Sequence, residues 1–239
     1  MYRLDQIEKH YGVTSVLRDI TCTIPIDGLV AVMGPSGSGK STLLRLLSFV
    51  ETPDHGTIHL TLNGDSFDSL GNSRPWPRVT CVFQKQFLWP HLTLLDNIRL
   101  PIRTIGQQDA DKRVAKVIEL FGMTHFVDRF PNQVSGGQAQ RAALARALVL
   151  DPQLILIDEA HSGLDLEQQS ILNEHLLTLK SSGVSLIIVT HSLDFARLYA
   201  DHVVVVENGA ITSIGSQEVF QKPVSAYLHR AMSLTKSAE

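Results

Sequence analysis

The sequence predicts an α/β fold, and three features of its 239 residues support this prediction. Short apolar runs at 29–33, 154–157 and 186–190 have the length and composition of buried strands. Segments with helical spacing of apolar residues lie between them, and the clearest one runs from Ala110 to Phe121. A glycine-rich stretch joins the first buried strand to a helix. We therefore expect a core sheet accompanied by helices.

The composition is that of one large globular domain with a sizeable core. Lys and Arg number 21 against 24 Asp and Glu, so the net charge near −3 gives no electrostatic reason to expect nucleic-acid binding. Cys22 and Cys81 suit reduced core thiols in a cytosolic protein, with a disulfide as the alternative. The first residues have no signal-peptide pattern, and no apolar run is long enough to span a bilayer. Any membrane role must then go through a partner.

The N-terminal part predicts antiparallel strands, because residues 2–26 alternate between apolar and polar side chains. Residues 56–62 form a further predicted strand, and Asn63-Gly64 is a strong turn signal. Residues 65–78 are polar and contain glycine and prolines, which predicts a loop. Tyr11 precedes the glycine-rich stretch. Its ring could stack on a base or fill an ordinary core or edge-strand position.

The glycine-rich stretch fits the P-loop pattern G-x-x-x-x-G-K-[ST], and it has the strand before and the helix after that this motif needs. Glycines let consecutive backbone N–H groups turn toward a phosphate, and the helix adds the positive end of its dipole. Lys40 would reach the β- and γ-phosphates, and the Ser41 hydroxyl would bind Mg²⁺. A plain turn that caps a helix is the alternative. The stretch consists of Gly34, Pro35, Ser36, Gly37, Ser38, Gly39, Lys40, Ser41 and Thr42.

The middle of the chain begins with a predicted buried strand at 79–83, and Gln84 follows at its carboxyl end. Ligands of open α/β sheets gather at that edge, so Gln84 could orient water or bind Mg²⁺, or it could simply end the strand. From there to about residue 149 the pattern is mostly helical. A helix at 139–150 is opened by a possible second anion cradle, which is also an ordinary helix cap: Ser135, Gly136, Gly137 and Gln138.

Polar side chains end two later strands. Asp158 and Glu159 follow the apolar run 154–157, and an acid in this position holds Mg²⁺ in P-loop enzymes. Glu159 is placed to polarise an attacking water, although two solvated acids are the alternative. His191 ends the strand at 186–190, and we expect it to reach the same edge and to hold a γ-phosphate or the water beside it.

The remaining C-terminal elements follow from turn signals. Asp165 lies in a turn before a long predicted helix at 166–182, which Gly183 stops. A hairpin at 202–214 turns at Asn208-Gly209. A short helix near 216–220 and a polar tail at 233–239, expected to be frayed, complete the chain.

The order of these motifs resembles the ATP-binding cassette (ABC) ATPases over essentially the whole chain. Ser135-Gly136-Gly137-Gln138 matches the family's signature motif, which separates that family from other P-loop proteins. The resemblance assigns the Q-loop glutamine to Gln84, the Walker B pair to Asp158 and Glu159, the D-loop acid to Asp165, the switch histidine to His191 and the adenine-stacking aromatic residue to Tyr11.

The resemblance implies the ABC ATPase fold: a nucleotide-binding core with an antiparallel β subdomain at 1–84 and 151–239, and a helical signature subdomain at about 85–150. It implies two identical or paired cassettes packed head to tail, with each ATP between one P-loop and the other chain's signature. Glu159 would be the general base, and His191 would position the γ-phosphate and the water. ATP and Mg²⁺ are the implied cofactors, with Mg²⁺ held by Ser41, Gln84 and, through water, Asp158.

Within the family, residues 89–98 and 131–133 are most similar to polar amino-acid uptake systems, although Gln86-Phe87 replaces that subgroup's Phe-Asn pair. Ala160-His161 also departs from the usual Pro-Thr, and Val134 from the signature's leading Leu. The resemblance implies an ATPase subunit on the cytoplasmic face of the cell membrane. Its partners would be a separate transmembrane permease and, through the permease, a solute-binding protein.

Other classes stay open beside this one. Exporters and importers of other solutes remain alternatives for the substrate. A soluble ABC protein of DNA repair or translation usually carries a coiled-coil insertion or a second cassette, and neither is present in this sequence. A switch GTPase would need an Asn-Lys-x-Asp motif, which the sequence lacks. Neither a kinase nor a GTPase accounts for Ser135–Gln138.

Overall fold

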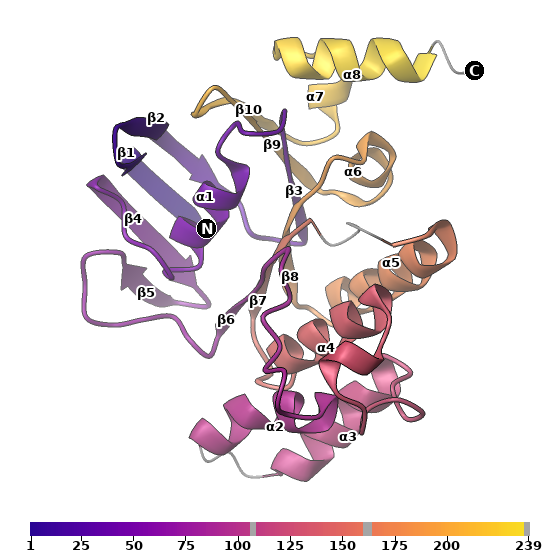
Figure 1. The fold of residues 1–239 in the computed structure, drawn as a ribbon. Helices are drawn as coiled ribbons and strands as arrows, with labels where there is room; N and C mark the ends of the chain where they lie inside the picture. The colour runs from indigo at the N-terminus through magenta and orange to yellow at the C-terminus, as the bar shows by residue number, and fades with distance from the viewer. Residues whose placement is uncertain (106–108, 160–163, 237–239) are drawn as a thin grey trace. The chain divides into compact units, whose positions relative to one another are not determined.

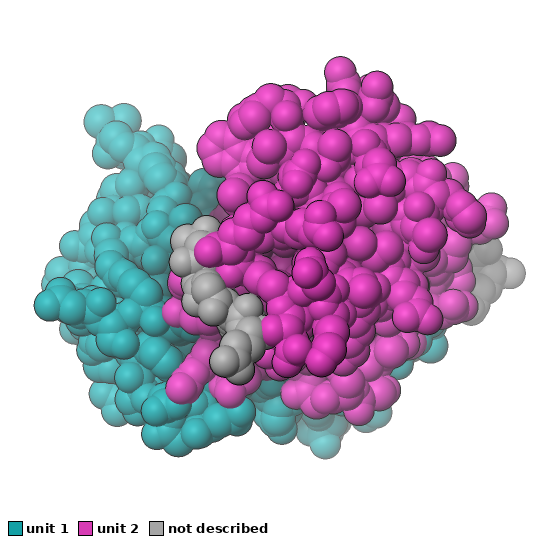
Figure 2. Space-filling model, turned by 90° about the horizontal axis from the view of Figure 1, so that it is seen from below, with its two compact units in different colours: residues 1–75, 185–239 teal, residues 76–184 magenta. Residues whose placement is uncertain are grey.

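The computed structural model describes residues 1–105, 109–159 and 164–236 (Figure 1). The contacts within the chain divide it into two compact units, which Figure 2 colours separately. Unit 1 contains residues 1–75 and 185–239, and unit 2 contains residues 76–184. Unit 1 therefore takes both ends of the chain, and unit 2 is one continuous insertion between them.

An antiparallel sheet forms the first part of unit 1, as the alternating pattern predicts. Its strands are β1 (Tyr2–Tyr11), β2 (Thr14–Ile24), β4 (His55–Leu62) and β5 (Asp65–Asp68), in the order β2-β1-β4-β5. One face of β1 is buried, because every second residue near its start is apolar and inaccessible to solvent.

Strand β5 corrects the prediction that residues 65–78 form a loop throughout. Asn63 and Gly64 both adopt positive φ, 48° and 88°, which is the geometry of a two-residue hairpin turn. The chain therefore returns along β4, with Leu62 opposite Asp65 and Leu60 opposite Phe67. The strand lies at the edge of its sheet and is mostly polar. A pattern of buried apolar residues therefore could not predict it.

A second group of strands in unit 1 surrounds β3 (Leu29–Met33). β3 pairs in parallel with β8 (Ser185–Val189) on one side and with β9 (His202–Glu207) on the other. β10 (Ala210–Gly215) then pairs antiparallel with β9, as the predicted hairpin requires. All five residues of β3 are buried, and burial of each of its Leu, Val and Met side chains stabilises the fold by roughly 1.5–3 kcal/mol.

The helices of unit 1 are α1 (Lys40–Leu47), α6 (Leu193–Tyr199), α7 (Glu218–Gln221) and α8 (Ala226–Lys236). Helix α8 was not predicted: the tail expected to fray from residue 233 is helical as far as Lys236. Leu228 explains why, because it is fully buried and gives the helix an apolar anchor.

Unit 2 contains one parallel strand pair, β6 (Val79–Val82) with β7 (Leu154–Asp158). Its helices are α2 (Leu94–Ile105), α3 (Ala110–Leu120), α4 (Gly136–Leu148) and α5 (Leu166–Ser181), and a short 3₁₀ turn, η1, covers Pro131–Gln133. Helix α4 packs on α2, on α3 and on β6, so it forms the centre of the unit. α5 ends one residue before the predicted bound, and Gly183, at φ 90°, stops it as predicted.

The helices also bear on whether the chain crosses a membrane. Among those of the described residues, none combines the length and the apolar character needed to span a bilayer.

Candidate active site

The glycine-rich stretch connects β3 to α1 by a tight loop that only small residues permit. Gly34 adopts φ 149°, and a Cβ there would lie 2.0 Å from the Val206 carbonyl oxygen of β9. Gly39 adopts φ 104° directly before α1, and a Cβ there would lie 2.7 Å from Leu17. The backbone therefore approaches its neighbours more closely than any side chain allows, and the loop has the compact shape of a phosphate cradle.

The side chains of the loop add a positive charge and an unused polar group. Lys40 is 5% exposed, and its Nζ donates hydrogen bonds to the carbonyl oxygens of Gly34 (3.0 Å) and Pro35 (2.7 Å). The hydroxyl of Ser38 is buried and has no hydrogen-bond partner within the described part of the chain. A buried ammonium group at a helix N-terminus attracts an anion, and the Ser38 hydroxyl can serve the same ligand.

A cavity of about 500 Å³ opens beside this loop within unit 1. Gly37 of the loop, the β2 segment around Ser15 and Val16, and the β9–β10 turn at Asn208-Gly209 line it. Its volume lies within the range of small-ligand sites, roughly 300–1,000 Å³. Its lining also includes Thr14 and the cationic side chain of Arg18, which suits a polar or anionic ligand such as a sugar or phosphate group.

Tyr11 lies at the end of β1 in the same unit and is 42% exposed. Its hydroxyl donates a hydrogen bond to Glu51, and the Nζ of Lys9 lies 5.7 Å from the centre of its ring. One edge of the ring is thus fixed. The accessible ring leaves the predicted stacking role open.

Two of the predicted polar residues meet at the carboxyl ends of β6 and β7 in unit 2. The side-chain amide of Gln84 donates a hydrogen bond of 2.7 Å to Oε2 of Glu159. Asp158, the last residue of β7, is 4% exposed. Glu159 adopts φ 51°, a left-handed conformation that non-glycine residues rarely take.

The signature residues form a capping box at the start of α4. The Ser135 hydroxyl accepts a hydrogen bond from the Gln138 N–H (3.3 Å), and the Gln138 side chain accepts one from the Ser135 N–H (3.1 Å). The motif therefore does cap the helix, as the alternative to an anion cradle predicted. Gly136, between them, has open space where a Cβ would lie, so the first turn of α4 can be approached closely.

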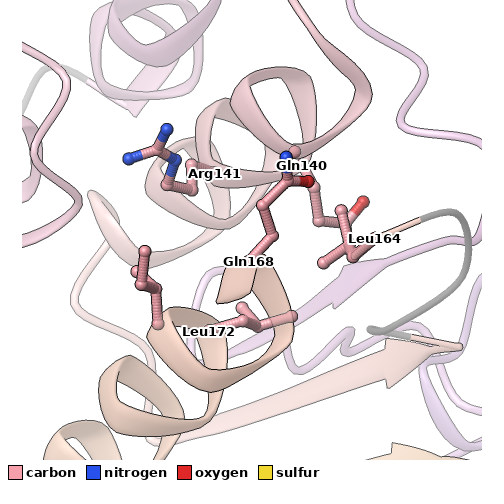
Figure 3. A pocket seen from close by; sticks show the side chains of 7 residues that line it. Gln140, Arg141, Leu164, Gln168 and Leu172 are labelled. Carbon is pink, nitrogen blue, oxygen red and sulfur yellow. The ribbon is translucent and has the colours of Figure 1, made fainter. Parts of the chain in front are cut away.

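Helix α4 packs against the start of α5 around a small pocket of about 30 Å³ (Figure 3). A Cβ on Gly137 would lie 2.5 Å from the side-chain oxygen of Gln168, so this glycine permits the contact. Asp165 is the N-cap of α5 and accepts a hydrogen bond of 2.8 Å from the Gln168 N–H. The signature helix and the predicted D-loop acid are thus joined through Gln168.

The predicted residues fall into two groups. Unit 1 holds the glycine-rich loop, Tyr11 and His191, which is exposed two residues beyond β8. Unit 2 holds Gln84, Asp158, Glu159, the signature and Asp165. Ala160, His161, Ser162 and Gly163 lie outside the described residues.

Sequence reasoning assigned no role to Arg146 or to Gln140 of α4. The guanidinium of Arg146 donates two hydrogen bonds of 2.8 Å, from Nη1 to the Phe87 carbonyl and from Nη2 to the Gln86 carbonyl. The Gln86 amide in turn donates to Oε1 of Gln140 at 3.1 Å. An arginine and a glutamine on the alanine-rich face of a central helix are the signal that could have identified both.

A glycine loop between a buried parallel strand and a helix, with its lysine folded over it, defines a P-loop protein. A family model described as "ABC transporter" matches residues 17–162. The chain therefore belongs to the ABC transporter family, and the predicted family resemblance and ABC ATPase fold are confirmed.

Relatives named for several different transport roles share the same degree of identity. The glutamate transport ATP-binding protein GluA of Corynebacterium glutamicum is 37% identical over 88% of this chain and 88% of its own length. The arginine transport ATP-binding protein ArtP of Escherichia coli is 37% identical over 92% of this chain and 94% of its own. The sulfate/thiosulfate import ATP-binding protein CysA of Synechococcus elongatus is 37% identical over 95% of this chain, which spans 66% of that protein.

A solved structure of an ATP-binding cassette, a dimer in a post-hydrolysis state with ADP and Pi, has a TM-score of 0.80 to this chain. It is 28% identical, and the match covers 91% of this chain and 99% of the other.

Proposed function

We propose that this chain is the ATP-hydrolysing subunit of an ABC importer, and that it powers uptake of a small polar solute through a separate membrane permease. The observation that carries the proposal is the hydrogen bond of 2.7 Å between Gln84 and Glu159 at the strand ends. It holds a carboxylate in one orientation at the sheet edge, which a general base requires.

ATP binding would rest on the loop Gly34–Thr42. The buried Lys40 ammonium exchanges the Gly34 and Pro35 carbonyls for the β- and γ-phosphates, and the loop N–H groups bind the same anion. The adjoining cavity of about 500 Å³ has room for the ribose. The ring of Tyr11 stacks on the adenine.

Mg²⁺ fits the donor set of this chain. In the described residues, no cluster of three or more His, Cys, Asp or Glu side chains could hold a metal ion unaided. Mg²⁺ in P-loop enzymes needs no such cluster, because phosphate oxygens and water complete its shell. Ser41 and Gln84 would bind it directly and Asp158 through water. The ion would neutralise charge on the phosphates.

Hydrolysis would use Glu159 and His191. Glu159 accepts a proton from the attacking water while Gln84 fixes its carboxylate, and His191 holds the γ-phosphate and that water in line. Lys40 stabilises the negative charge that develops on the phosphate oxygens. Asp165 lies at the contact between the two cassettes.

The second ATP-binding surface would come from another cassette. Ser135, Gly136, Gly137 and Gln138 of one chain face the ATP on the P-loop of the other, with the first turn of α4 offering its N–H groups. The cap hydrogen bond between Ser135 and Gln138 keeps those groups oriented before the dimer forms. The dimeric cassette with ADP and Pi supports this arrangement by analogy.

The substrate we favour is a polar amino acid, by analogy with the glutamate and arginine relatives. The equally identical sulfate relative makes an inorganic anion the second candidate. The chain would lie on the cytoplasmic face of the membrane, bound to the permease and through it to a solute-binding protein.

The experiment is reconstitution. The tagged chain is purified with the membrane protein that co-isolates, placed in vesicles with MgATP inside, and supplied with labelled glutamate, arginine or sulfate. ATP-dependent accumulation of one solute supports the proposal. Absence of ATP hydrolysis by the complex would overturn it.

A further inference from the structure

The segment that carries Gln84 is held by a helix rather than by a sheet. Between the end of β6 at Val82 and the start of α2 at Leu94 the described chain has no regular secondary structure. Its backbone carbonyls therefore have no partners from a helix or a strand ladder, and bind side-chain donors or water. Arg146 of α4 supplies two of them, one each for Gln86 and Phe87, at 2.8 Å.

The backbone at this point is also strained. Phe87 adopts φ 47°, a left-handed conformation that a bulky aromatic residue takes only when its surroundings enforce it. The Arg146 guanidinium binds the Phe87 carbonyl and the one before it, and its planar fork fixes both directions at once. Burial lowers the pKa of Arg146 from its usual value. A guanidinium nevertheless stays protonated in proteins.

A side-chain contact adds a third hold on the same segment. Gln140, which is 4% exposed, accepts a hydrogen bond of 3.1 Å from the Gln86 amide. Gln140 and Arg146 lie on one helix, so α4 holds both the backbone and the side chain of this segment. Two residues upstream, Gln84 reaches Glu159.

We propose that Arg146 and Gln140 are positioning residues that set Gln84 against Glu159, and so orient the base that activates water. This inference rests on the proposed ATPase function. Neither residue touches the reacting atoms; each acts through the segment 84–87.

The test compares Arg146→Met, Arg146→Lys and the control Arg113→Met. Arg113 is a half-buried arginine of α3 in the same unit, and its Nη2 lies 3.8 Å from Asp151 instead of on the segment. We expect Arg146→Met to lower kcat by about tenfold to 10²-fold, the scale on which small misplacements act, with the KM for ATP unchanged. The kcat of Arg146→Lys, which keeps one donor group, is expected to lie between those of Arg146→Met and the wild type. The kcat of Arg113→Met is expected to equal that of the wild type.

Two further readouts separate positioning from general damage. In a Gln84→Ala background, Arg146→Met is expected to cause no additional loss of kcat, because the two act in series. Hydrogen exchange of the amides at 84–89 becomes faster in Arg146→Met and in Gln140→Leu, while exchange in α4 is unchanged. If Arg146→Met does not fold, Gln140→Leu carries both measurements.

Different outcomes would overturn the positioning role and the proposed ATPase function. Wild-type kcat and unchanged exchange in a folded Arg146→Met or Gln140→Leu would overturn the positioning role, and so would additive losses with Gln84→Ala. A wild-type complex that does not hydrolyse ATP would instead overturn the proposed function, and the exchange data would still decide whether α4 holds the segment.

Discussion

At the scale of single residues, Glu159 combines three properties in one place. It follows a fully buried strand, and its backbone is in the left-handed region at φ 51°. Its carboxylate accepts a hydrogen bond from the Gln84 side-chain amide. Such backbone strain persists only where neighbouring structure enforces it, and it gathers at functional sites. The conformation therefore agrees with the proposed role as base.

We predict that Glu159→Gln lowers ATP hydrolysis by roughly 10²–10⁴-fold, the usual contribution of a positioned general base. The amide keeps the shape of the side chain but cannot accept the proton of water. Nucleotide affinity is expected to remain near wild type, because Lys40 and Ser41 are untouched. Steady-state turnover and equilibrium binding measure the two effects, and wild-type turnover would contradict the assignment.

Lys40→Ala is predicted to affect binding as well as turnover. Its ammonium is the buried cation of the loop, so its removal takes away the charge that faces the phosphates. Nucleotide-binding and ATPase assays are both expected to show a loss. Near wild-type values in the two assays would exclude this loop as the phosphate site.

Cys22 gives a prediction for pH. Burial raises the pKa of its thiol to about 11 from an ordinary value of 9.0, and the thiol is free. The unfolded chain therefore loses this proton first as pH rises, so stability falls between about pH 9 and about pH 11. Cys22→Ala is expected to remove that part of the pH dependence in urea titrations. An identical pH profile for the variant would show that Cys22 has no part in it.

At the scale of elements, the β9–β10 hairpin is fixed by its glycine. Gly209 has φ 79°, and a Cβ there would lie 2.5 Å from the Val16 carbonyl oxygen of β2. Its own carbonyl accepts a hydrogen bond from the Arg18 N–H at 2.9 Å. The turn therefore holds β2 beside the cavity next to the P-loop.

Gly209→Ala is predicted to destabilise the protein more than Gly183→Ala. Both positions have positive φ, which costs an alanine roughly 1–2 kcal/mol, but a Cβ added at Gly183 would meet no atom within 4 Å. The clash with Val16 adds to the cost only at Gly209. Chemical denaturation of the two variants measures the difference, and equal losses would mean that the turn relaxes freely.

Most elements could be predicted because their signals are local. The apolar run of β3, the Asn63-Gly64 turn and the stop at Gly183 each depend on a few adjacent residues. The edge strand β5 and helix α8 were missed because pairing with Leu60 and burial of Leu228 depend on distant parts of the chain. Local patterns do not contain such tertiary contacts.

The candidate site divides in the same way. Its residue types and order could be read from motifs, including Gln84 and Glu159. Their hydrogen bond, the left-handed turn at Glu159 and the hold of Arg146 on the Phe87 carbonyl could not, because each depends on three-dimensional proximity.

At the scale of the whole molecule, the proposed function requires two cassettes. We predict that Glu159→Gln forms more dimer than wild type in MgATP, because the γ-phosphate that bridges P-loop and signature is not removed. Adding Ser135→Arg is expected to abolish that dimer, since a bulky side chain fills the phosphate seat. Light scattering measures both states. Slow hydrolysis without dimer formation would retain the base and exclude the head-to-tail sandwich.

The pairing of β3 has a consequence for how the protein is made. Both of its neighbours, β8 and β9, come from beyond residue 184, and Gly34 closes against Val206 of β9. During synthesis the glycine-rich motif is made well before β8 and β9, the two strands that pair with β3. Such distant pairing also slows folding.

We therefore expect nucleotide to bind this loop only after β9 has paired with β3. A chain that stops before β9 contains every residue of Gly34–Thr42 but lacks the partner that shapes the loop. Chains that end before β9 are then expected not to bind ATP through this loop. The topology thus makes the pairing of β3 with β9 a precondition for nucleotide binding.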